Sequence, residues 1–142
     1  MRIDRGQIAA MIPHAGTMCL LDAVVCWDAR SIRCLTGCHR RADNPLRRPD
    51  GMLGAVCGVE IAAQAMALHG RLIADRVDPP IPGYLASVRD VRLRVARLDQ
   101  VADELVVDAE LLMEDMRGAS YRFVVGADLL SGRATVMFGV AE

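Results

Sequence analysis

The stretch that decides the fold of this chain is CGVEIAAQAMALHGRLI, residues 57–73. Drawn as a helix, it is apolar on nearly all sides, and such a helix is normally buried inside a domain. Its early turns hold two polar side chains, Glu60 and Gln64, which lie about 40° apart on one face at roughly 100° per residue. A buried carboxylate is costly unless it is paired, hydrogen-bonded or beside a wet pocket. Glu60 is therefore the first functional candidate.

Length and composition predict one soluble domain that spans residues 1–142. A chain of 142 residues is long enough to bury about two-thirds of its unfolded surface, so no second domain is needed. Hydrophobic residues make up 53% of the chain, but no apolar run reaches the roughly 18–20 residues of a membrane span. We expect the apolar surplus to form the interface of a homo-oligomer, a dimer or a multiple of dimers.

The N-terminus, the charges and the cysteines limit the expected location and partners of the protein. Residues 1–5, MRIDR, lack the apolar core of a signal peptide, which indicates a cytoplasmic protein. The net charge of −1 gives no reason to expect nucleic acid. The five cysteines lack zinc-ribbon spacing, so we expect reduced core thiols and no metal. Four arginines crowd the segment ahead of the apolar stretch: Arg40, Arg41, Arg47 and Arg48.

On both sides of the apolar stretch, the sequence patterns predict mostly β-strands. Ahead of it we expect a short helix over residues 4–12, a hairpin of strands over 18–27 and 31–36, and a loop over 40–54. Behind it we expect four strands, over residues 84–98, 105–113, 121–129 and 133–140, with turns at 115–118 and 131–132. A loop as long as the one over 40–54 is uncommon in a compact domain and is often functional.

This order of elements predicts the fold class. One very apolar helix with strands on both sides of it in the sequence is best buried when the sheet wraps around it. We therefore predict an α+β chain with the hotdog fold, in which an antiparallel sheet surrounds one long central helix. Two such protomers usually place their sheets edge to edge, which covers apolar surface and protects the strand edges.

Three motifs occur in the order in which they occur in a known family. Residues 12–22, IPHAGTMCLLD, resemble the PH…LLD opening of the hotdog 3-hydroxyacyl-[acyl-carrier-protein] dehydratases. Residues 60–64, EIAAQ, resemble the family's central-helix motif E-A-x-A-Q, and residues 83–92 resemble the strand that follows. The resemblance covers residues 5–140 and is closest to the divergent branch found with aryl-polyene biosynthetic clusters.

This resemblance implies a lyase that removes water from a 3-hydroxyacyl thioester in fatty-acid-like or polyene biosynthesis. It implies no cofactor of the enzyme's own, because the acyl chain is carried on the phosphopantetheine arm of an acyl carrier protein. The reaction needs a base for the C2 proton, an acid for the leaving hydroxyl, and hydrogen-bond donors for the thioester carbonyl.

The family's site residues have uneven counterparts in this chain. In the family, a carboxylate on the central helix protonates the hydroxyl, and a histidine from the preceding loop takes the proton. Glu60 matches the carboxylate, and Gln64 matches the amide that orients it. Leu46 stands at the position of the loop histidine, beside Asn44, whose amide can orient a hydroxyl or a water but is no base. His14, which the family also keeps, either lines the site or fastens the N-terminal segment by a hydrogen bond.

Further binding roles are expected from the resemblance and from residue chemistry. Ser87 stands where the family usually has a glycine that donates its backbone N–H to the thioester, and Gly58 belongs to a helix N-terminus that favours an anion. The four arginines at 40, 41, 47 and 48 are either solvated or bind the carrier's phosphate and carboxylates. His69 lies about half a turn from Glu60 and cannot partner it, and His39 is expected at the surface.

Three functions are open at this point. The first is a dehydratase in which Glu60 is the acid and His14, or a water held by Asn44, completes the site. The second is a hotdog thioesterase, which needs no histidine because Glu60 can activate water or attack the carbonyl. The third is a non-catalytic acyl-binding subunit that pairs with an active hotdog partner, in which Glu60 is a buried carboxylate satisfied by Gln64 and backbone donors. The fold alone does not separate them.

Overall fold

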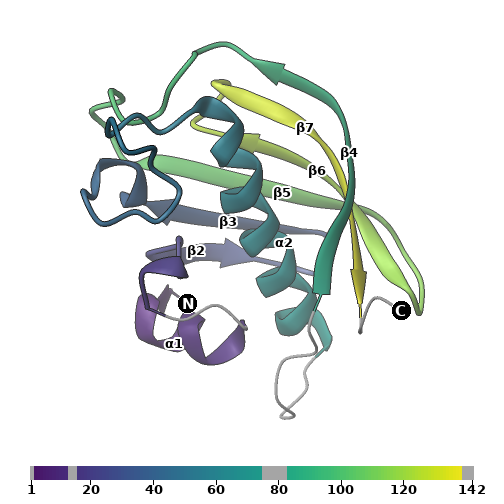
Figure 1. Ribbon diagram of the computed structural model, residues 1–142. Coiled ribbons are helices and arrows are strands. Elements are labelled where there is room, and N and C mark those ends of the chain that lie inside the picture. The colour runs from purple at the N-terminus through teal and green to yellow at the C-terminus, as the bar shows by residue number, and fades with distance from the viewer. Residues whose placement is uncertain (1, 13–15, 75–82, 139–142) are drawn as a thin grey trace.

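The computed structural model describes residues 2–12, 16–74 and 83–138. Its two α-helices are α1 (Arg5–Met11) and α2 (Gly58–Ala74). Its strands are β1 (Ile3–Asp4), β2 (Ala23–Trp27), β3 (Ser31–Thr36), β4 (Gly83–Leu93), β5 (Leu105–Glu114), β6 (Gly118–Val125) and β7 (Leu130–Phe138). They form one seven-stranded antiparallel sheet in the order β1-β2-β3-β5-β6-β7-β4, which curves around α2 (Figure 1). The predicted α+β hotdog class is confirmed.

Helix α2 is buried as its composition predicts. It packs against β3, β5, β6 and β7, and its side chains Ile61, Ala65 and Leu68 are fully buried there. Val107 and Phe123, which are also fully buried, form part of the same core. In the described part of the chain, no helix is long and apolar enough to cross a membrane.

The predicted N-terminal helix is present as α1, and a cap stabilises its first turn. The Asp4 carboxylate accepts a hydrogen bond from the Gln7 main-chain N–H at 2.9 Å, and the Gln7 side chain accepts one from the Asp4 N–H at 3.0 Å. This reciprocal capping box satisfies two donors that a helix start otherwise leaves unpaired. Ile8, fully buried, fixes the helix to the core.

The strand predicted over residues 18–27 is wrong in its first half. Residues 16–18 form a 3₁₀ turn, and strand pairing begins only at Ala23. The reason lies in the buried segment between the 3₁₀ turn and β2, where side chains rather than a neighbouring strand bind the main chain. The Leu20 N–H donates to the Gln64 side chain at 2.9 Å, and the Leu20 carbonyl accepts from the Thr36 hydroxyl at 2.5 Å.

The boundary between the last two strands, β6 and β7, also differs from the prediction. The turn predicted at 131–132 is wrong: Gly132 lies inside β7, where an added Cβ would stand 2.9 Å from the Phe123 ring. The turn lies at 126–129 instead, where Gly126 and Ala127 have φ of 66° and 67°, so the strand predicted over 121–129 ends at Val125.

Strand β4 is an edge strand with two irregularities. Its pairing with β7 shifts register between Leu85 and Ser87 and again between Arg89 and Arg92. Asp90, within the second shift, has a φ of 57°. Beyond Leu93 the chain leaves the sheet, which ends the strand before the predicted residue 98.

Two histidines are buried in the fold. The His69 Nε2 donates to the Asp28 carbonyl at 2.8 Å, so its Nδ1 accepts from the Tyr121 hydroxyl at 2.7 Å. These partners explain why His69 serves the core rather than a site. The surface location expected for His39 is wrong: it is fully buried, and its Nε2 donates to the Val101 carbonyl at 3.1 Å. Burial lowers the pKa of both imidazoles.

These two histidines predict a pH dependence of stability. Because His39 and His69 have lowered pKa values in the folded chain, the unfolded chain binds protons first as pH falls. The free energy of unfolding should therefore be constant above about pH 7 and fall below about pH 6.5, by about 1.4 kcal/mol per pH unit for each histidine until the folded pKa is reached. Urea unfolding between pH 5 and pH 8 measures this slope, which His69→Gln should reduce. A flat profile would contradict the prediction.

Candidate active site

Glu60 lies in the first turn of α2 and is half-buried. It is the one acidic residue of that helix. Along the same side of α2 follow Ala63, Ala67 and Gly70, which are also only partly buried. This side of the helix therefore has its carboxylate at one end and small residues behind it.

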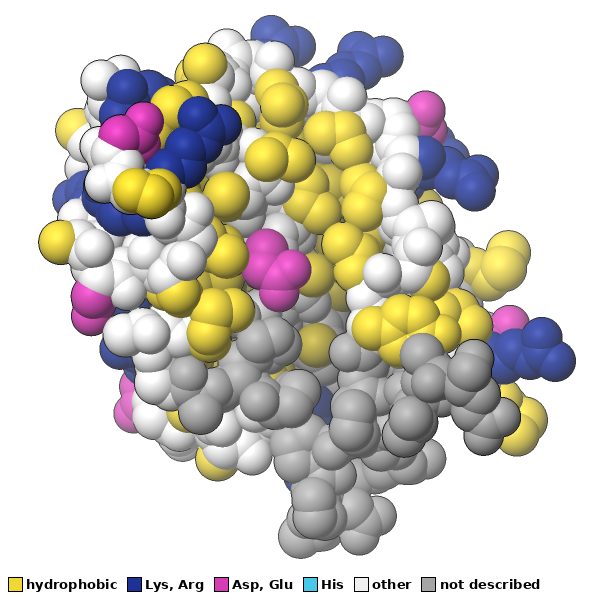
Figure 2. Space-filling view, in the orientation of Figure 1, with side chains coloured by type: hydrophobic (Ala, Val, Ile, Leu, Met, Phe, Trp, Pro, Cys, Tyr) yellow, Lys and Arg dark blue, Asp and Glu magenta, His cyan; other side chains and the backbone are white. Residues whose placement is uncertain are grey.

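The surface beside Glu60 is apolar. Figure 2 shows hydrophobic side chains gathered between α2 and β4. Val91 and Leu93 of β4 are 38% and 49% exposed, and Val56, just before α2, is 61% exposed. Leu85 and Val88 are partly buried against the core. Such a surface suits an acyl chain or the apolar face of a second subunit.

Gly58 permits the close start of α2. A Cβ at this position would stand 2.2 Å from the Leu130 Cδ2 of β7, so a larger residue would require the Leu130 side chain or the helix start to move. The glycine is buried. The glycine thus allows the start of α2, and with it Glu60, to lie close to β7.

Gln64 binds main chain rather than standing free beside Glu60. Its Oε1 accepts from the Leu20 N–H at 2.9 Å, and its Nε2 donates to the Met18 carbonyl at 2.6 Å. The side chain is 1% exposed. It therefore ties the segment after the PH motif to α2, one helical turn beyond Glu60. His14 itself lies outside the described residues.

Asn44 organises the loop in which it stands. Its Nδ2 donates to the Cys38 carbonyl at 2.9 Å, and its Oδ1 accepts from the Leu46 N–H at 2.9 Å. It borders a hollow of about 210 Å³ whose walls include Arg5 and Arg41. Arg5 was not among the residues predicted for a site. It donates to the main-chain carbonyls of residues 16 and 19 at 3.1 and 3.0 Å.

The four loop arginines are unequal. Arg47 donates to three carbonyls, those of residues 39, 41 and 51, at 3.0, 2.8 and 2.6 Å. Arg41 forms an ion pair with Asp22, and Arg40 donates to the carbonyl of residue 102 at 2.8 Å. Arg48 is exposed and contacts the Met52 sulfur at 3.5 Å. Arg47 and Arg41 thus hold the loop together, whereas Arg40 and Arg48 face solvent.

Ser87 and the cysteines complete the set of candidates. Ser87 is exposed on β4, opposite Thr135 of β7. Burial raises the pKa of Cys34 to about 12 and raises that of Cys38, so neither is a nucleophile at neutral pH. Among the described residues, no cluster of His, Cys, Asp and Glu has the arrangement of a metal site.

Comparison with solved structures shows the fold. The chain is similar to the dehydratase heterocomplex ApeI:P from Xenorhabdus doucetiae, with 23% identity, a TM-score of 0.82, and coverage of 94% of this chain and 91% of that chain. It is also similar to a mutant thioesterase, PA1618, from Pseudomonas aeruginosa, with 14% identity, a TM-score of 0.65 and coverage of 96% and 94%. Zebra fish thioesterase superfamily member 2 has 11% identity, a TM-score of 0.60 and coverage of 96% and 98%.

Comparison with protein families adds the chemistry. No curated protein matches the sequence. The family described as ApeP-like, ApeP dehydratase, matches residues 6–138, which include α2 with Glu60 and every strand from β2 to β7. Because the match extends over nearly the whole chain, this protein belongs to the ApeP-like dehydratase family and is a lyase that removes water.

Proposed function

We propose that this protein dehydrates a 3-hydroxyacyl thioester carried on the phosphopantetheine arm of an acyl carrier protein, in fatty-acid-like or aryl-polyene biosynthesis. The observation that carries the proposal is Glu60: one carboxylate, half-buried on α2 beside an apolar surface, in a member of a dehydratase family. An apolar surface next to a proton donor suits an acyl chain whose hydroxyl must leave.

In this reaction Glu60 is the general acid and His14 is the base. His14 takes the C2 proton, the electrons of that bond form the C2–C3 double bond, and the C3 hydroxyl leaves as water with the proton of Glu60. Return of the proton from His14 to Glu60 restores the enzyme. Each acid–base group contributes about 10²–10⁴-fold to such a rate. The Gly58 N–H, expected to favour an anion, donates to the carbonyls of Ala55 and Val56 instead. The proposed donor to the thioester carbonyl is therefore the Ser87 N–H.

The hydrogen bonds of Gln64 support the pairing of His14 with Glu60. Met18 and Leu20, which follow the PH motif, are bound to Gln64, and Gln64 lies one turn from Glu60 on the same side of α2. Ile12, just before the motif, is 3% exposed. The described residues on both sides of the PH motif are therefore anchored, and those after it are bonded to the helix that carries Glu60. Asn44, with its amide bound to the loop, is the weaker candidate for holding a water.

We also propose that a second subunit pairs along β4. This strand is the edge of the sheet, and it exposes Tyr84, Val91 and Leu93 by 42%, 38% and 49%. An apolar edge of this kind is normally covered. The subunit is either a second copy of this chain or another dehydratase chain, since the similar structure from Xenorhabdus doucetiae is described as a heterocomplex.

The decisive experiment follows the mass of the acyl group. The purified chain, whose mass in solution is measured first, is incubated with a 3-hydroxyacyl carrier-protein thioester. Loss of water is expected. Loss of the whole acyl group would instead identify a thioesterase, and an unchanged substrate would identify a subunit that needs an active partner.

The same assay tests the carrier. With the acyl group on free pantetheine, the proposed arginine contacts to the carrier are absent. Arg48→Glu should therefore slow the reaction of the carrier-bound substrate at low salt, where such contacts are strongest, and leave the pantetheine substrate unaffected. Arg30→Glu, an equal charge change at an exposed turn, is the control. If Arg48→Glu converts the carrier-bound substrate as fast as the wild type does, docking by the group Arg40, Arg41, Arg47 and Arg48 is contradicted.

A further inference from the structure

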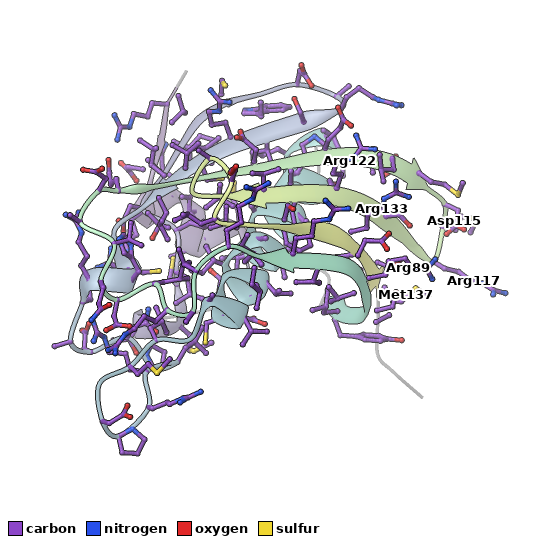
Figure 3. All side chains as sticks on the ribbon, turned by 90° about the horizontal axis from the view of Figure 1, so that it is seen from above. Arg89, Asp115, Arg117, Arg122, Arg133 and Met137 are labelled. Atoms are coloured by element: carbon purple, nitrogen blue, oxygen red, sulfur yellow. The ribbon has the colours of Figure 1, made fainter. Side chains whose placement is uncertain are left out.

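The outer face of the sheet, which points away from α2, carries a row of arginines. In the strand register, Arg122 of β6 lies opposite Arg133 of β7, and Arg133 lies opposite Arg89 of β4. Figure 3 shows the three in succession across these strands. Arg122 and Arg133 have side chains that are 52% and 53% exposed, and Arg89 is also exposed.

This row is only partly balanced by carboxylates. Like charges directly opposite each other on neighbouring strands are destabilising. Glu110 lies 3.1 Å from Arg122, and Asp90 lies 4.0 Å from Arg133. Within the described part of the chain, no carboxylate lies within ion-pairing distance of Arg89. Arg122 is thus matched by Glu110, which lies directly opposite it on β5. Arg133 has only the more distant Asp90, so Arg133 and Arg89 are the weakly balanced members of the row.

The other half of the same face is paired in the usual way. Arg33 of β3 lies opposite Asp108 of β5 and bonds to it through two nitrogens, at 2.7 and 3.3 Å. Arg122 is matched in the same way by Glu110 on the neighbouring strand, whereas Arg133 and Arg89 have no carboxylate opposite them. Departures from such local consistency are expected at functional surfaces.

Next to the arginine row lie groups that suit a protein interface. The neighbouring outward row consists of Ser120, Thr135 and Ser87, whose hydroxyls can donate to oxygen acceptors. Beyond it, Met137 lies opposite Tyr84, which is 42% exposed. Arginine, tyrosine and methionine are the residue types enriched in protein interfaces.

We propose that this outer face of β6, β7 and β4 is the docking surface for an acidic α-helix of a partner protein. Neighbouring strands place the three arginines about 4.8 Å apart, and side chains at i, i+3 or i+4, and i+7 on a helix are spaced by about 5–6 Å. A helix that crosses the strands with Glu or Asp at these positions would set one carboxylate against each of Arg122, Arg133 and Arg89.

Other occupants fit this face less well. A second copy packed by the same face would bring two arginine rows together. An anionic lipid surface would also meet Asp108, Glu110 and Asp90, and the whole chain has a net charge of −1. Glu60 stands on α2, on the opposite side of the sheet. A partner bound to the outer face therefore forms an assembly with the enzyme and does not deliver substrate to Glu60. The inference does not depend on the proposed reaction.

A helical peptide tests the proposal. The probe is a fluorescent peptide of about 15–20 residues, long enough to form a helix, with Glu at i, i+4 and i+7 on one face. Its binding to the full chain at low salt is measured by fluorescence anisotropy. Binding is expected, with affinity about tenfold weaker in the double variant Arg89→Gln with Arg133→Gln, since exposed ion pairs each contribute modestly. The control peptide has the same composition with Glu spread around the helix, and Arg30→Gln is the control variant.

A second variant separates docking from damage to the fold. Arg133→Glu places a carboxylate between Arg122 and Arg89, so it should raise the Tm of the free chain and abolish peptide binding. The proposal is overturned if the wild-type chain prefers neither peptide, or if the arginine variants bind as well as the wild type. Arginine-dependent binding to phosphatidylserine vesicles without binding of the peptide would also overturn it, in favour of a lipid surface.

Discussion

Replacing Glu60 with Gln should abolish dehydration while leaving the fold unchanged. The substitution keeps the size of the side chain and removes its exchangeable acidic proton, so the C3 hydroxyl must leave without an acid. A loss of about 10²–10⁴-fold in kcat is expected. Since Glu60 is half-buried rather than part of the fully buried core, the Tm should change little. The acyl-mass assay gives the rate, and a thermal melt gives the stability.

Glu104→Gln is the matched control for this experiment. Glu104 is exposed in the loop before β5, so the same chemical change there should leave both the rate and the Tm unaltered. Full activity in the Glu60→Gln variant would show that another group supplies the proton. In that case the site assignment would fail, although membership of the family would stand.

The second large effect is expected on stability. Gln64→Leu should lower the free energy of unfolding by about 1–3 kcal/mol or somewhat more, because it leaves one buried and one part-buried main-chain group without their partner, and an unpaired buried group costs about 1–3 kcal/mol. These groups are the Leu20 N–H and the Met18 carbonyl. Urea unfolding measures the change. Gln100→Leu, at an exposed loop position, should have almost no effect.

Gln64→Glu separates this structural function from catalysis. A carboxylate still accepts from the Leu20 N–H but cannot donate to the Met18 carbonyl when it is ionised. Its stability should therefore fall at neutral pH and partly recover in acid, where the protonated form donates again. If Gln64 served only to orient Glu60, both variants would lose activity at unchanged stability, which contradicts the expectation.

The central helix and the order of the strands were predictable because their signals are local. The apolar stretch over residues 57–73 nearly coincides with α2, and the strand expected over 31–36 coincides with β3. Glu60 was recognisable as a candidate because it is a carboxylate on a very apolar helix. The PH motif and the family resemblance brought His14 and Gln64 into consideration, but not the contacts of Gln64, which join residues distant in the sequence.

The errors come from contacts that no local pattern encodes. His39 lies beside two arginines in the sequence, which predicts a surface residue. In the structure it donates to the carbonyl of Val101, which belongs to a loop distant in the sequence. Gly132 reads as a turn, but it is glycine because the Phe123 ring lies against it. For Arg47 the sequence left a solvated and a docking arginine open, and it did not indicate the three carbonyls of its own loop to which Arg47 donates.

The irregular edge of β4 has a consequence for solubility. A long regular edge strand offers its unpaired main-chain groups to any other chain and so invites growth into fibrils. The two register shifts in β4 and the left-handed Asp90 between them interrupt that offer, because a regular strand cannot stay in register across a bulge. A partner strand with a matching bend can therefore pair with β4, whereas the regular strands of a growing fibril cannot. Straightening it would put concentrated protein at risk of aggregation.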